Sequence, residues 1–151
     1  MSKPTFDTAA AHRWFAVEAN NRAWDLIEQE RRTPVEEREL LDAAHASSHH
    51  WTHVGQPINE LRSLVLLAAA HHGVGDTRQA LRFAGLAVAK IDDVGEAATP
   101  FDRAIAFRGL AVLASAAGDD DVARQAREQF EIAIVALKGA DDVEMVRKMF
   151  R

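Results

Sequence analysis

The chain has 151 residues, 48% of them hydrophobic and 27% charged, with a formal net charge of −5 at pH 7. Its length predicts a single domain over residues 1–151 that is large enough to bury a core. The negative net charge and the scattered arginines disfavour a nucleic-acid partner, and the absence of cysteine excludes disulfides and thiol chemistry.

Targeting signals and membrane spans are not recognisable in the sequence. The N-terminus lacks the apolar core of a signal peptide, and the longest apolar run, Leu64 to Ala70, is too short to cross a bilayer. We therefore expect a soluble, cytoplasmic protein with no membrane partner.

The first predicted helix runs from about Asp7 to Glu30. Residues at three- and four-residue spacing predict one core-facing stripe, formed by Ala10, Trp14, Val17, Asn21, Trp24 and Ile27. Asn21 interrupts this stripe between apolar residues, so we expect its side chain to be buried and hydrogen-bonded.

The next two helices have clear start signals. Thr33-Pro34-Val35-Glu36 is a capping box with proline at the first helical position, and the helix that it opens should end at Gly55. Pro57 opens a third helix, which Gly73 or Gly75 closes. This third helix is apolar on all sides from Leu64 to Ala70, which predicts a central position.

The remaining helices have the same kinds of start and stop signals. A fourth begins at the cap Asp76 and runs to about Asp92, and Thr99-Pro100 opens a fifth that Gly118 ends. A sixth runs from the caps at 119–121 to Gly139, and a short seventh follows Asp141-Asp142 as a cover over the last hairpin, through Met145, Val146 and Met149. No segment has the alternation of a strand, so the sequence predicts an all-α fold.

Two segments look like copies of one helical hairpin, offset by 43 positions. Both have large and then small residues, a Gly-Asp turn and a second helix with small residues; Leu64, Leu67, Ala68, Gly75, Ala80, Ala84 and Ala87 match Phe107, Leu110, Ala111, Gly118, Ala123, Arg127 and Phe130. The pattern resembles the tetratricopeptide (TPR) repeat. It implies about three antiparallel hairpins in a right-handed stack.

A wider set of residues is similar to a group of small bacterial TPR-like proteins of unassigned function. The set comprises Asn21-x-x-Trp24, Arg32-Thr33-Pro34, Ala44-His45-Ala46-Ser47-x-x-His50-Trp51, Val54-Gly55, Asn59-x-x-Arg62 and Phe101-Asp102-x-Ala104-x-Ala106. The resemblance implies the fold but no reaction. The chain departs from the group at Arg108, where its members have a glutamate.

Four of the seven histidines lie between residues 45 and 53. His45, His49 and His53 recur every four residues along one side of the helix, and an adjacent pair such as His45 and His49 has the spacing of a chelating pair. A straight helix cannot place three successive turns around one ion. We therefore favour a solvated stripe, predict no cofactor, and retain His45 and His49 as the only metal candidates.

The turn at Gly55 folds the third helix back on the second and should bring His50, Trp51, Asn59 and Arg62 to one half-buried corner. One hypothesis is structural: Asn59 caps a helix, Arg62 pairs with Glu60 or a first-helix carboxylate, and His50 bonds a carbonyl. The other is a binding site for a small anion or a peptide carboxylate with Arg62 as the fork. Asn21, Trp24 and His45 would line the same cleft.

No catalytic motif is present, because the serines lack a G-x-S-x-G context and no glycine-rich phosphate loop occurs. The leading interpretation is a non-enzymatic module that binds a protein or peptide, as a monomer or a homodimer. The alternative is a small-molecule-binding or catalytic domain in which His50 carries a proton.

Overall fold

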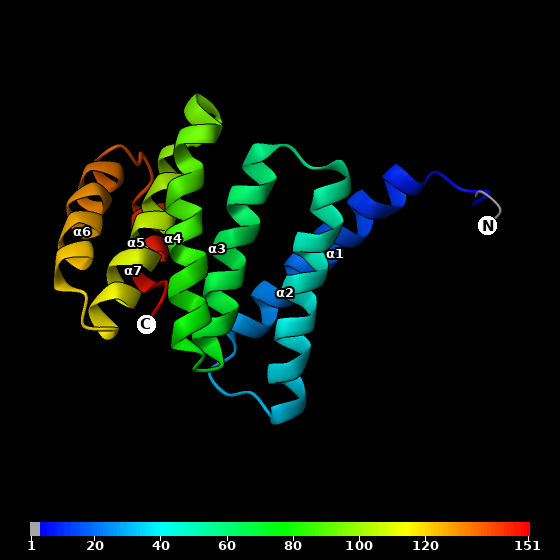
Figure 1. The fold of residues 1–151 in the computed structure, drawn as a ribbon, viewed down its shortest axis with the longest axis horizontal. Helices are drawn as coiled ribbons and strands as arrows, with labels where there is room; N and C mark the ends of the chain where they lie inside the picture. The colour runs from blue at the N-terminus through cyan, green and yellow to red at the C-terminus, as the bar shows by residue number, and fades with distance from the viewer. Residues whose placement is uncertain (1–3) are drawn as a thin grey trace.

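The computed structural model describes residues 4–151, and this part of the chain forms seven α-helices and one 3₁₀ turn (Figure 1). Their bounds are α1 Thr8–Glu28, α2 Pro34–Val54, α3 Pro57–Gly73, α4 Thr77–Val94, η1 Gly95–Ala97, α5 Pro100–Ala116, α6 Asp120–Val135 and α7 Ala140–Lys148. The predicted all-α class is confirmed. None of the helices within residues 4–151 is long and apolar enough to span a membrane.

The helices begin where the sequence signals indicate. Thr33 and Thr99 each form a complete capping box with an acidic residue at the third helical position, and proline occupies the first turn of α2 and α5. Asp76 and Asp119 accept a backbone N–H at the starts of α4 and α6. Gly75 and Gly118 precede these caps, each with φ of 80°, a conformation that disfavours a side chain.

Consecutive helices pack as antiparallel pairs, α1 with α2, α3 with α4, and α5 with α6, and the pairs lie side by side (Figure 1). The first helices α1, α3 and α5 also contact one another in that order, while α2 contacts α3 and α4 contacts α5. Helix α3 is therefore central, and it contributes a nearly continuous buried run over residues 65–71.

The predicted core stripe of α1 is wrong up to Asn21, whereas Trp24 and Ile27 are half-buried and pack against the core. The buried residues of this helix are Ala16, Ala23 and Leu26, whereas Trp14 is 58% exposed, Val17 is 41% exposed and Asn21 is exposed. Both sets have helical spacing, and the close packing of α1 on α2 selects the small side chains, since alanine lets two backbones approach. Trp14 and Val17 are left on the exposed side of the helix, while Leu26 joins the buried side.

The C-terminal helix packs against α5. Val146 is fully buried and Phe150 is 7% exposed, whereas Met145 is 53% exposed, so Phe150 supplies part of the cover that was expected of Met145. The ring of Phe150 lies directly over Gly109, where an added Cβ would come within 2.8 Å of its Cζ atom. Arg108 donates hydrogen bonds to the carbonyls of Met149 and Arg147 and holds the end of the chain in place.

Candidate functional site

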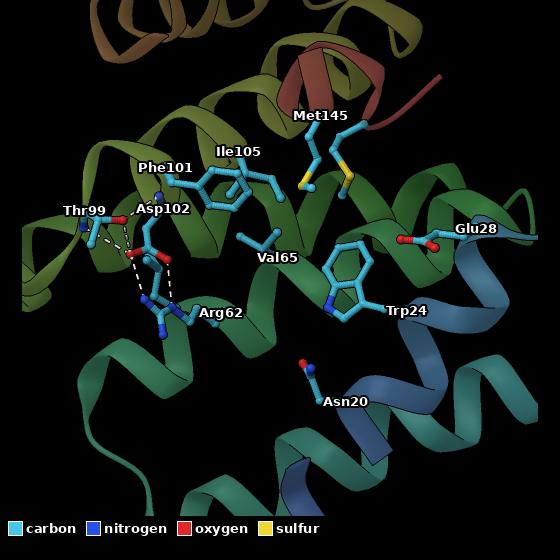
Figure 2. Close-up of a pocket in the computed structure, with 12 residues that line it drawn as sticks. Asn20, Trp24, Glu28, Arg62, Val65, Thr99, Phe101, Asp102, Ile105 and Met145 are labelled. Atoms are coloured by element: carbon cyan, nitrogen blue, oxygen red, sulfur yellow. Dashed lines mark hydrogen bonds and ion pairs between the residues drawn. The ribbon is translucent and has the colours of Figure 1, made fainter. Parts of the chain in front are cut away.

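A cleft of about 400 Å³ lies between the first helices of the three hairpins and the C-terminal helix (Figure 2). Helix α3 supplies Leu61, Arg62 and Val65, and the other lining residues come from α1, the start of α5 and α7. They are Asn20, Trp24 and Glu28, then Thr99, Phe101, Asp102 and Ile105, and finally Met145 and Met149. A cleft of this size can hold a few side chains of a ligand.

One end of the cleft is polar, and its centre is the carboxylate of Asp102 (Figure 2). Arg62 donates to it through two nitrogens, Nε at 2.8 Å and Nη2 at 3.1 Å, which is a bidentate pair. Thr99 donates its backbone N–H at 3.0 Å and its hydroxyl at 2.7 Å to the second carboxylate oxygen. The side chain of Asp102 is 5% exposed and that of Arg62 is 56% exposed, so the ion pair joins a buried carboxylate to a solvent-exposed guanidinium.

These contacts fix the charge at this end of the cleft. Burial raises the pKa of Asp102, but the hydrogen bonds from Arg62 and Thr99 together outweigh it, and the net pKa lies below its usual value. The hydrogen bond to Asp102 raises the pKa of Arg62. Asp102 therefore neutralises most of the charge that Arg62 would offer to an anionic ligand.

The rest of the cleft is mainly apolar. Trp24 and Glu28 of α1 lie at the end opposite the Arg62–Asp102 pair, and Met145 borders the cleft from α7 (Figure 2). Val65, Phe101 and Ile105 complete the apolar lining. The unbranched thioethers of the methionines can adapt to ligands of different shape.

The structure brings only two of the residues predicted for the site, Trp24 and Arg62, into this cleft. Trp51 instead lines a separate groove of about 410 Å³ at the turn between α2 and α3. Asn59 caps α3, as the structural hypothesis expected, by accepting the backbone N–H of Gln56 at 2.9 Å. Asn21 is exposed and accepts a hydrogen bond from Asn20, so its expected burial is wrong.

The expected partner of Arg62 is also wrong. Glu60 pairs with Lys90 at 2.9 Å, and the partner of Arg62 comes from α5, 40 residues along the chain. No local sequence signal indicates this pairing. The capping motif Thr99-Pro100-Phe101-Asp102 locates Asp102 at a helix start, but its second role depends on how α5 packs beside α3.

The predicted histidines form two pairs outside the cleft. His45 Nε2 lies 3.1 Å from His71 Nε2, and His50 Nδ1 lies 2.8 Å from His12 Nδ1. His50 therefore bonds an imidazole of α1 and not the carbonyl that the structural hypothesis expected. Within residues 4–151 no group of three or more histidine, aspartate or glutamate side chains is placed to hold a metal ion.

Comparison with known proteins adds no assignment. No family model, no curated protein and no solved structure matches this chain.

Proposed function

We propose that the protein is a TPR-like interaction module that binds an apolar segment of a partner polypeptide in the cleft between α1, α3, α5 and α7. The observation that carries this proposal is an open cleft of about 400 Å³ whose lining is largely apolar and comes from every hairpin. Stacked helical hairpins expose their first helices along one continuous surface, which suits an extended ligand.

Exposed apolar residues beyond the cleft support a polypeptide ligand. Val17 lies two turns before Trp24 on nearly the same side of α1, and it is 41% exposed. A ligand that covers this side of α1 as well as the cleft would remove several large apolar side chains from water. Each one that becomes fully buried contributes about 1.5–3 kcal/mol.

The charges favour an apolar or cationic segment over an anion. Arg62 is neutralised by Asp102, and Glu28 at the other end of the cleft forms no ion pair with any of residues 4–151. This arrangement weakens the hypothesis of a peptide-carboxylate site. A basic residue of the ligand could instead lie beside Glu28.

The small-molecule alternative would use the same cleft, but the residue expected to carry a proton lies elsewhere. His50 bonds His12 and does not line the cleft. The ionisable lining residues are Arg62, Asp102 and Glu28, and the first two are occupied with each other. These observations favour binding over catalysis.

Selection from a random peptide display library tests the proposal. We expect an enriched motif with two or more apolar anchors that binds the purified protein in calorimetry. Met145→Glu places a charge on the open wall of the cleft and should weaken that peptide at least tenfold. Ile132→Glu is the matched control, because Ile132 is 66% exposed on α6, outside the cleft.

Two outcomes would reject the module. One is the absence of any enriched peptide, and the other is an equal loss of binding in the Met145→Glu and Ile132→Glu variants. A metabolite that stabilises the protein, and does so less in the Met145→Glu variant, would favour the small-molecule alternative.

A further inference from the structure

Histidine takes part in every hydrogen bond and ring contact that the structure shows between α2 and the first two turns of α1, residues 8–15. The buried residues of α1 begin at Ala16, so this segment, the α1 arm, has no fully buried side chain. Its hydrogen-bonded and aromatic contacts with α2 are the His12–His50 bond at 2.8 Å, the stacking of His12 on His53 with ring centres 4.1 Å apart, and the stacking of Phe15 on His50 at 5.4 Å. Each of these contacts includes an imidazole.

The chemistry of the central bond makes it sensitive to protons. A hydrogen bond between two imidazole nitrogens needs a proton on one nitrogen and a lone pair on the other. It holds while His12 and His50 carry one charge or none between them. When both rings are protonated, both Nδ1 atoms are donors, the bond is lost, and His12 also lies against a cationic His53.

The surroundings provide little compensation for this charge. No Asp, Glu, Lys or Arg occurs over residues 43–59, so histidine is the only titratable residue on the second half of α2. His49 extends the cluster, with ring centres 5.6 Å from His50 and 5.0 Å from His53. The formally charged residues nearest His12 along α1 are Asp7, Arg13 and Glu18, of which Asp7 caps the helix.

The lowered pKa of His50 agrees with this geometry. Burial, and then the charges of His12, His49 and His53, lower the pKa of His50, and no carboxylate acts in the opposite direction. Protonation of these histidines at acidic pH therefore weakens the contacts between α1 and α2.

We propose that the α1 arm is an acid-released segment: the cluster of His12, His49, His50 and His53 holds it on α2 at neutral pH, and protonation detaches it while the rest of the fold stays intact. The arm ends at a stronger anchor, because Ser47 is fully buried and donates its hydroxyl to the carbonyl of Ala16 at 2.9 Å. The release would uncover the His50 side of α2 and free Phe15. This inference does not depend on the proposed binding function.

Hydrogen exchange between pH 7.5 and 5.5, in buffer with EDTA to exclude metal, tests the proposal. We expect protection at residues 12–16, corrected for the intrinsic effect of pH, to fall five- to tenfold at pH 5.5. Protection at the core residues 65–70, which exchange through global unfolding, should stay far above that of the arm at both pH values. The His12→Gln/His50→Gln double variant should reduce the response of the arm to under twofold, because glutamine does not titrate.

His45→Gln is the matched control, since it removes a histidine of α2 that pairs with His71 and not with the arm; its arm should respond as in the wild type. Trp14, which lies within the arm, gives a second readout: in a Trp24→Phe/Trp51→Phe background its fluorescence should change with the same midpoint. Protection that is independent of pH in the wild type, or a response undiminished in the double variant, would overturn the proposal.

Discussion

The clearest test of the tertiary arrangement is Asp102→Ala, because this carboxylate serves two structures at once. It closes the capping box of α5 through Thr99, and it is the partner of Arg62 on α3. Loss of a cap costs about 0.5–2 kcal/mol, and a hydrogen bond to a charged group contributes about 1.5–3 kcal/mol. We therefore expect Asp102→Ala to lower the free energy of unfolding by about 2–5 kcal/mol.

The converse change should cost less, because the cap is kept. Arg62→Ala leaves the Thr99 hydrogen bonds to Asp102 intact but removes the partner of Oδ1 on a buried carboxylate, so it should cost about 1.5–3 kcal/mol. Asp119→Ala isolates the capping contribution, because Asp119 accepts only the backbone N–H of Val122 and forms no ion pair with the described residues. It should cost about 1 kcal/mol.

Urea denaturation followed by circular dichroism at 222 nm measures all three variants. The expected order of loss is Asp102→Ala first, then Arg62→Ala, then Asp119→Ala. For a chain of this size about 3 kcal/mol corresponds to a fall in Tm of about 6–12 °C. Equal losses for Asp102→Ala and Asp119→Ala would refute the reasoning, because the contact between α3 and α5 would then contribute nothing.

Three further predictions follow from packing and titration. Gly109→Ala should cost about 1–3 kcal/mol because its Cβ would meet the ring of Phe150, whereas the control Gly85→Ala, in α4 with open space at its Cβ, should gain up to about 1 kcal/mol in the same urea assay. A chain ended at Gly139 loses Val146 and Phe150, and it should self-associate in size-exclusion chromatography with light scattering; a monomer with unchanged Tm would contradict the covering role of α7. Burial and the charge of His71 lower the pKa of His45, so the free energy of unfolding should fall as pH drops below about 6.5. A His45→Gln variant that keeps the full wild-type pH dependence between 7.5 and 5 would show that His45 contributes nothing.

The sequence by itself determined the number of helices and where most of them begin, although the sixth ends at Val135 and not at the predicted Gly139. Capping residues, proline and glycine act through backbone geometry within four or five residues, so Thr33, Thr99, Asp76 and Gly118 fix local structure wherever the helices pack. The fifth helix, for example, begins at Pro100 in both the sequence and the structure. The short spacing between consecutive helices likewise indicated sequential antiparallel packing.

Only the tertiary structure decided which side of α1 faces the core and which polar residues meet. On α1, the alanine face and the tryptophan face have similar periodicity, and the close approach of α2 selects the smaller side chains. The partner of Arg62 lies 40 residues away, and the corner expected at Gly55 separates because Trp51, His50 and Arg62 leave α2 and α3 in different directions. Helix rotation and stacking depend on the summed packing of many side chains, which no local pattern encodes.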